Sequence, residues 1–177
     1  MAFSFEATGK EGVIGTMNSE IRYINWNEGA NIRLGASHIG KSIDGASFDK
    51  ASFPNPLFLT GGENGVVKLW TSKTGDKLFG LSPTYQPING IFSHPKARIA
   101  AILSEDGYIH FFNFKRLSLI GRVHLNDKIP TYASFAVTGE ALIVGTSSES
   151  IFQITSDDWE HLSNMRVSVF TEIEGIV

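Results

Sequence analysis

The sequence predicts an all-β protein built from four similar units of four strands each. A shared anchor position recurs at intervals of 46, 42 and 42 residues, at Gly15, Gly61, Leu103 and Gly145. Around each anchor, apolar and polar residues alternate in short runs, as strands require, and no long segment has the spacing of an amphipathic helix. Asn64-Gly65 and Asp106-Gly107 stand between two such runs and favour tight hairpin turns.

Four strands can be placed in each unit, and the third unit shows them most clearly, at residues 88–92, 99–103, 108–112 and 117–123. The repeat sets the four units at about residues 3–38, 42–81, 87–124 and 130–169. A spacing near 42 residues with four strands per unit is typical of β-propeller blades, whose sheets stack radially and cover one another's faces.

The second and third units resemble blades of the WD40-repeat family. The resemblance rests on FLTGGENGVVKLW at residues 58–70 and on FSHPKARIAA with SEDGYIHFF at residues 92–112. In that family a His, a Ser or Thr, a turn Asp and a Trp share buried hydrogen bonds. The turn position here is Asn18, Asn64, Asp106 or Ser148, and only the second unit has the Trp, so no unit keeps the complete network. We therefore expect apolar packing to supply most of the stability.

The repeat register also predicts an incomplete ring. FEATG at residues 5–9 matches FAVTG at 135–139, and IEGI at 173–176 matches INGI at 88–91. These matches predict that the chain opens inside a first strand and that residues 173–177 begin a fifth blade. Because WD rings usually have about seven blades, the expectation is an open arc that is a piece of a longer protein or completes a ring with another chain.

Composition narrows the classes of function. The chain has 177 residues, 15 basic and 18 acidic side chains, no cysteine and no basic run. A nucleic-acid surface is not expected from such a balance, and disulfides and thiolate metal sites are excluded. The sequence has no stretch of 18 apolar residues and no signal peptide, so we expect no membrane partner and a cytoplasmic protein.

One segment suggests a different class of function. GASHIGKS at residues 35–42 satisfies the phosphate-binding loop pattern G-x-x-x-x-G-K-[ST]. That chemistry requires a helix directly after the loop, whereas residues 43–48 read as a strand in repeat phase. Nucleotide binding through this segment remains an alternative to an inter-blade loop. The five His residues and Asp157-Asp158 form no metal or catalytic pattern, so no enzyme and no cofactor are predicted.

A protein-interaction face is expected where the turns between second and third strands meet the inter-blade loops, because propeller topology brings both to one end of the blades. Its charge should be mixed to acidic. The candidate residues are Asn18, Glu20, His38, Lys41, Glu63, Asn64, Tyr85, Glu105, Asp106, Asp127, Lys128, Ser148 and Glu149. Trp26 and Trp159 are expected to pack between blades.

The first unit, with VIGTMNSEIRYINW at residues 13–26, looks like blades of large WD-repeat proteins of centrioles and cilia, such as the echinoderm-microtubule-associated-protein-like proteins and a proteome-of-centriole relative. This resemblance implies a scaffold in a microtubule-based structure, with tubulin or other centriolar or axonemal proteins as partners. Self-association through open blade edges is a further expectation. The alternative is a propeller subunit of a ubiquitin-ligase or trafficking complex.

Overall fold

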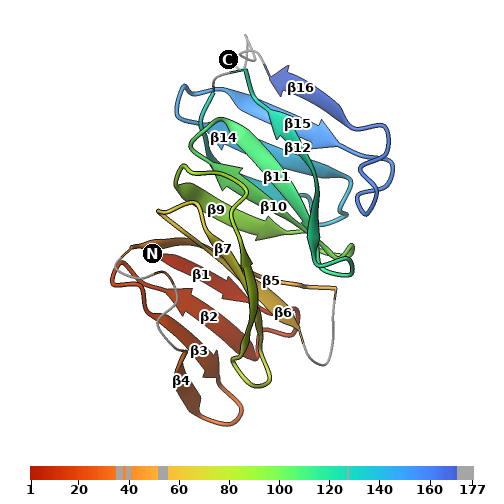
Figure 1. Cartoon of the computed structure of the whole chain (residues 1–177). Helices are drawn as coiled ribbons and strands as arrows, with labels where there is room; N and C mark the ends of the chain where they lie inside the picture. Colours follow the sequence, from red (N-terminus) through yellow and green to blue (C-terminus); the bar gives the residue numbers. More distant parts are fainter. Residues whose placement is uncertain (35–37, 39–40, 52–55, 127, 171–177) are drawn as a thin grey trace, which may run out of the picture.

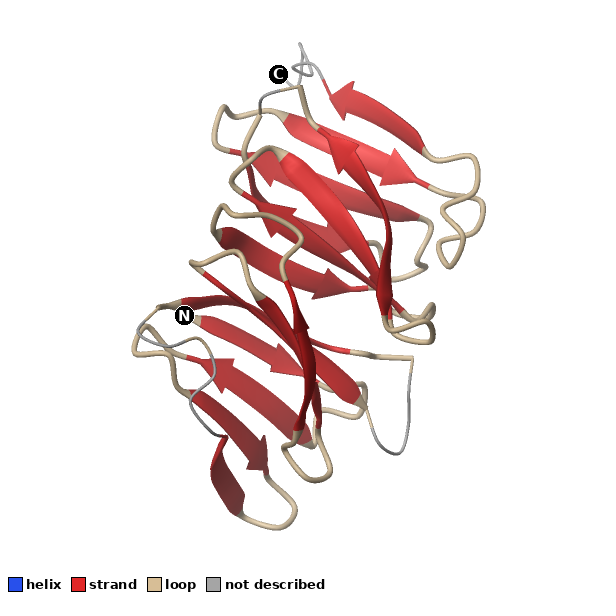
Figure 2. Ribbon diagram, in the orientation of Figure 1, coloured by secondary structure: helices blue, strands red, loops and turns tan. Residues whose placement is uncertain are grey.

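The computed structural model describes residues 1–34, 38, 41–51, 56–126 and 128–170. Every regular element in these residues is a β-strand, as Figure 2 shows. The strands form four separate antiparallel sheets, and in each sheet the spatial order follows the chain order. The predicted all-β fold with four four-stranded blades is therefore confirmed. The predicted start of a fifth blade, residues 173–177, lies outside the described residues.

The first two sheets occupy the N-terminal half of the chain. The first contains β1 (Ala2–Phe5), β2 (Glu11–Gly15), β3 (Ile21–Asn25) and β4 (Ala30–Leu34). The second contains β5 (Ile43–Phe48), β6 (Leu57–Gly62), β7 (Val67–Thr71) and β8 (Lys77–Leu81). Gly65 takes a φ of 72° in the turn between β6 and β7, a conformation that favours glycine.

The third and fourth sheets repeat this arrangement. The third contains β9 (Ile88–Ser93), β10 (Ile99–Ser104), β11 (Tyr108–Asn113) and β12 (Ser118–His124). The fourth contains β13 (Pro130–Phe135), β14 (Ala141–Thr146), β15 (Ile151–Thr155) and β16 (Arg166–Phe170). Figure 1 shows the sheets following one another, so that the first and the fourth lie at opposite ends of an arc.

The sheets are held together by their first strands and by three apolar cores. β1 packs against β5, β5 against β9, and β9 against β13. One core joins the first and second sheets, including Val13, Ile43 and Phe58, and a second joins the second and third sheets. The third core joins the third and fourth sheets and includes Phe111 and Trp159. Each sheet is thus stabilised mainly by the apolar side chains of its neighbour.

The anchor glycines allow the close approach of consecutive sheets. A Cβ atom added to Gly15 would lie 2.4 Å from Cγ2 of Ile43, and one added to Gly61 would lie 2.6 Å from Cγ2 of Ile88. Each glycine therefore leaves room for the isoleucine at the start of the next sheet. A Cβ atom on Gly145 would meet only the carbonyl oxygen of Tyr132, at 4.0 Å. The anchor of the fourth sheet receives no such side chain from the described residues.

The two tryptophans predicted to pack between blades differ. Trp159 is 6% exposed, and its ring centroid lies 5.9 Å from that of Phe111 in the third sheet and 5.2 Å from that of Phe135 in the fourth. This prediction is confirmed. Trp26 is 49% exposed and contacts Phe5 on the outer face of the first sheet, so the prediction for Trp26 was wrong. Among the described residues no sheet covers that outer face.

Candidate interaction surface

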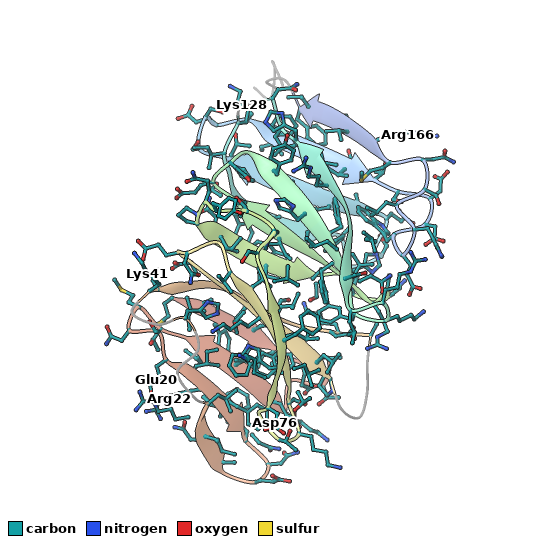
Figure 3. All side chains as sticks on the ribbon, in the orientation of Figure 1. Glu20, Arg22, Lys41, Asp76, Lys128 and Arg166 are labelled. Atoms are coloured by element: carbon teal, nitrogen blue, oxygen red, sulfur yellow. The ribbon has the colours of Figure 1, made fainter. Side chains whose placement is uncertain are left out.

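One end of the four sheets carries the turns between second and third strands, at residues 16–20, 63–66, 105–107 and 147–150, together with the inter-blade loops. We call this end the loop face. Figure 3 shows Glu20, Lys41 and Lys128 along one side of the molecule and Arg166 on the other. The predicted turns and loops are therefore brought together, as the topology of stacked hairpins requires.

Hydrogen bonds fix each of these turns to a neighbouring inter-blade loop. Ser19 Oγ donates to the carbonyl of Lys41 at 2.6 Å, and the amide of Glu63 donates to the carbonyl of Ser42 at 3.2 Å. In the later units, the amide of Glu105 donates to the carbonyl of Pro87, and that of Ser147 to the carbonyl of Ile129, both at 3.0 Å. Ser19 thus ties the turn of the first sheet to the loop that leads into the second, and the other three turns are tied to the loops that enter their own sheets.

Most of the predicted candidate residues lie at the surface of the loop face. Tyr85 is the most exposed, at 97%. Glu20, Asp106 and Lys128 are partly exposed, and the exposed residues are Asn18, Lys41, Glu63, Asn64, Tyr85, Glu105, Ser148 and Glu149. Asp127 lies outside the described residues. The prediction that His38 belongs to the interaction face was wrong, because its side chain is only 1% exposed and cannot contact a partner.

The charges of the loop face are partly compensated within the chain. A carboxylate oxygen of Glu20 lies 2.8 Å from Arg22 Nη2 and 3.3 Å from Arg33 Nε, so this part of the first sheet carries paired charges. Glu63, Glu105 and Glu149 are exposed acidic side chains. With Lys41 and Lys128 they give the mixed-to-acidic character that the turn sequences predict.

Asp106 is held within its turn. Its carboxylate accepts a hydrogen bond from Thr84 Oγ1 at 2.7 Å and another from the amide of Tyr108 at 3.1 Å. Burial opposes ionisation of Asp106, but the hydrogen bonds outweigh burial and lower its pKa. Asp106 therefore connects the loop at residues 82–87 to the third sheet, and its carboxylate is charged at neutral pH.

His38 takes part in a buried hydrogen-bond network beneath the loop face. Its Nε2 lies 3.0 Å from Thr60 Oγ1, and Trp70 Nε1 donates to the same oxygen at 2.9 Å. The second unit therefore keeps three members of the family network, with Asn64 at the turn position where the family has Asp. The family resemblance indicated the Trp and the turn residue of this unit, and the structure shows that His38, Thr60 and Trp70 are joined by hydrogen bonds.

The hypothesis that residues 35–42 form a phosphate-binding loop requires a helix directly after them, and the structure has a strand there. Lys41 and Ser42 are followed directly by strand β5, and their carbonyl groups accept hydrogen bonds from Ser19 in the turn of the first sheet and from the amide of Glu63 in the turn of the second. Gly35, Ala36, Ser37, Ile39 and Gly40 lie outside the described residues. A phosphate-binding loop uses the amides at the start of a helix, and a strand occupies that position here.

Sequence reasoning missed a group of aromatic and basic side chains at the loop-face end of the third sheet. The guanidinium of Arg122 lies 4.5 Å from the ring centroid of Tyr108, and the ring of His124 lies 4.5 Å from the same ring. Tyr108 pairs with His124 across β11 and β12, so the three side chains share one face of the sheet. Arg and Tyr are enriched among the residues that dominate binding energy at protein interfaces. Residues two apart on a strand lie on the same face, so aligning the two predicted strands at residues 108–112 and 117–123 could have indicated this group.

A groove runs along the axis on which the first strands converge. It has a volume of about 570 Å³, and β1, β5, β9 and β13 all contribute to its lining. The lining includes five aromatic residues, which are Phe3, Phe5, Phe92, Tyr132 and Phe135. This groove was not predicted, because it depends on how closely four separate strands approach one another.

The described residues show neither a metal site nor a membrane span. No group of three or more His, Asp or Glu side chains in this part of the chain is close enough to hold a metal ion. None of the described elements is a helix that is long and apolar enough to cross a membrane.

Comparison with known proteins finds WD-repeat relatives. The chain is 27% identical over 152 residues to WD repeat-containing protein 90 of Xenopus tropicalis, a match that covers 80% of this chain and 8% of that protein. It is 27% identical over 96 residues to a WD repeat-containing protein 55 homolog of Drosophila mojavensis, covering 54% of this chain and 19% of that protein. The chain thus spans less than a fifth of either relative. No protein-family model matches it.

Proposed function

Because the chain shares both the four-stranded blades and the sequence similarity of WD-repeat proteins, we propose that it is a non-enzymatic scaffold that binds other proteins through the loop face. The single observation that carries this proposal is the cross-linking of turns to inter-blade loops. Turns and loops whose backbone groups are hydrogen-bonded to one another present their side chains with little conformational freedom, and such preorganisation lowers the entropy lost on binding.

The exposed part of the loop face has the residue types that protein partners use. Tyr85 stands free of packing, and the Tyr108 and Arg122 pair lies at the same end of the third sheet. On the same face, acidic Glu63 and Glu105 are exposed and basic Lys128 is partly exposed. An aromatic and arginine centre with a charged rim is the usual anatomy of a protein interface.

The setting we propose is a centriole, a cilium or another microtubule-based structure, with tubulin or a centriolar or axonemal protein as the partner. Support comes from the resemblance of residues 13–26 to blades of WD-repeat proteins found in centrioles and cilia. That segment forms β2, β3 and the turn between them, so it contributes Asn18 and Glu20 to the loop face. The resemblance therefore covers residues of the proposed surface as well as the framework.

Co-sedimentation with polymerised tubulin tests the proposal directly. The 177-residue chain should pellet with microtubules, and the double variant Lys41→Glu with Lys128→Glu should reduce the pelleted fraction several-fold. A matched control is Lys73→Glu with Lys77→Glu, which makes the same charge change at exposed lysines of the second sheet, beyond the other end of β7. The control should pellet like the unmodified chain.

Two results would overturn the microtubule version. The chain could stay in the supernatant at every tubulin concentration, or both double variants could lose pelleting equally, which would indicate a nonspecific effect of net charge. A pull-down from a ciliated cell extract, compared between the chain and its Tyr85→Ala variant, then tests whether the loop face binds another protein.

A further copy of this chain is a second kind of partner that we propose. The last strand of each sheet has one edge without a strand neighbour among the described residues. These strands are β4, β8, β12 and β16. Unpaired backbone amide and carbonyl groups on such edges favour the addition of another strand.

A further inference from the structure

Strand β16 has the most accessible side chains of the four outer strands. All five of its residues are exposed, and Val167, Val169 and Phe170 are 45%, 51% and 48% exposed. One edge pairs with β15 in an unbroken register, and the other has no partner strand in the described part of the chain. Figure 1 shows β16 at the outer margin of the fourth sheet. An exposed, regular and apolar edge is a template for strand addition.

The other three outer strands carry features that discourage such pairing. β8 and β12 pair with their neighbours through an irregular register, which bends the edge. β4 is regular, but Arg33 lies within it and is ion-paired to Glu20. In β16 the only charged residue is Arg166, at its first position. The protection found at the other three edges is therefore missing from this one.

The sequence of β16 is complementary to itself when two copies run antiparallel. If Ser168 of one copy stands opposite Ser168 of the second, then Val167 stands opposite Val169, and Arg166 stands opposite Phe170. The period of two places the valine pairs on one face of the sheet and the Arg–Phe pairs on the other. Cross-strand pairs of β-branched residues and of a cation with an aromatic ring are both stabilising.

From this pattern we infer that two copies of the chain associate through antiparallel pairing of β16 with β16, in the register centred on Ser168. The two fourth sheets then form one continuous sheet across a two-fold axis. This inference rests on the self-association proposed above and names its edge and register. The valine pairs extend a row that is already buried, since Val167 and Val169 pair with Ile154 and Phe152 of the third core.

Paired charge variants test the register. Val167→Glu with Val169→Glu places acids opposite acids in the pair, and Val167→Lys with Val169→Lys places bases opposite bases. The unmodified chain should show a species of twice its 19.4 kDa mass in sedimentation equilibrium. Each double variant alone should run at the single mass, and an equimolar mixture of the two should recover the doubled mass. Recovery on mixing requires that both variants are folded.

A control separates this edge from the uncovered outer face of the fourth sheet. Ile143→Glu introduces an acid on that face, at a residue of β14 that is 37% exposed and does not pair with β16, and should leave the doubled mass intact. The inference is overturned if the unmodified chain has the single mass at all concentrations, if mixing restores nothing, or if the control abolishes association. Microtubule pelleting of the acidic β16 variant reports separately on the loop face, which that variant does not alter.

Discussion

His94 Nε2 lies 2.8 Å from the carbonyl oxygen of Gly139, and this contact joins the third sheet to the first turn of the fourth. The His94 Nδ1 atom accepts hydrogen bonds from the amides of Lys96 and Ala97, so Nε2 carries the proton and donates it to the carbonyl. Trp159 Nε1 donates to the same oxygen, also at 2.8 Å. One backbone carbonyl therefore holds a histidine and a tryptophan from two different sheets.

Replacing Gly139 with alanine should loosen this junction. Gly139 has a φ of 85°, and an added Cβ would lie 2.5 Å from His94 Cε1. The control is Gly9→Ala at the equivalent turn of the first sheet, where φ is 72° and no atom lies within 4 Å of the added Cβ. The positive φ should cost about 1 kcal/mol in both variants, and the clash should add about 1–3 kcal/mol to Gly139→Ala alone. Urea unfolding measures the difference, and equal losses would contradict the contact.

The variant Thr60→Val should destabilise the second sheet. It keeps the shape of the side chain but removes the oxygen that His38 and Trp70 share, which leaves two buried polar groups without their partner. We expect the free energy of unfolding to fall by about 2–4 kcal/mol. Thr71→Val, at a threonine whose hydroxyl bonds to Thr74 near the surface, is the control and should change stability by less than about 1 kcal/mol.

Acidification should destabilise the protein between pH 6.5 and pH 4. Burial lowers the pKa values of His38, His94 and His110, that of His38 from 6.5 to about 4. In this window the unfolded chain binds protons that the folded chain does not, so the free energy of unfolding decreases as the pH falls. His38 alone contributes about 3 kcal/mol to this change.

Thermal melts at a series of pH values, run on the unmodified chain and on His38→Gln, measure the contribution of His38. The variant should start less stable at neutral pH and lose less stability on acidification. Parallel pH profiles for the two proteins would show that His38 titrates normally in the folded state, contrary to its burial.

Removing Arg98 should leave a buried carboxylate without its counter-ion. Arg98 Nε lies 2.7 Å from Asp49 Oδ2, and the Asp49 side chain is 1% exposed. Burial raises the pKa of Asp49, while Arg98 acts to lower it. Arg98→Met should therefore raise this pKa further and cost roughly 3–5 kcal/mol at pH 7. Because the folded state then holds a proton that the unfolded state releases, the loss should be smaller at pH 5.

Lys115→Met is the comparison for the Arg98 variant. It breaks the pair between Lys115 Nζ and Glu160, which has the same 2.7 Å separation but leaves the lysine side chain 53% exposed. Solvent screens such a pair, so the expected loss is below about 1 kcal/mol. Similar losses in the two variants at pH 7 would contradict the role assigned to burial.

Much of the architecture could be predicted because it depends on local pattern. The alternation around Val67 and Leu69 required a strand, and Asn64-Gly65 required a tight turn that only a few residue types allow. The spacing of Gly15 and Gly61 indicated equivalent units. Only the structure explains why both positions are glycine: Ile43 and Ile88 of the following sheets occupy the space that a side chain would need.

The candidate site was predicted less completely, since the exposure of a side chain depends on parts of the chain that are far away in sequence. The positions of Tyr85 and Glu105 on the loop face follow from turn order, and both are exposed. The sequence places His38 in a loop, yet its side chain is buried and forms a hydrogen bond with Thr60. Tyr108, Arg122 and His124 look like ordinary strand residues until β11 and β12 are paired.

Repeat spacing, alternation and turn residues were sufficient to identify strands, hairpins and their grouping into four blades. Strands and hairpins depend on interactions between residues that are close in sequence, so the sequence pattern alone predicts them. The choice of covered and uncovered faces was made by stacking between sheets: Trp159 is buried because the third sheet lies beside it, whereas Trp26, on the outer face of the first sheet, stays half exposed. Burial is a property of the neighbouring sheet, and a single strand's pattern does not specify whether that neighbour is present.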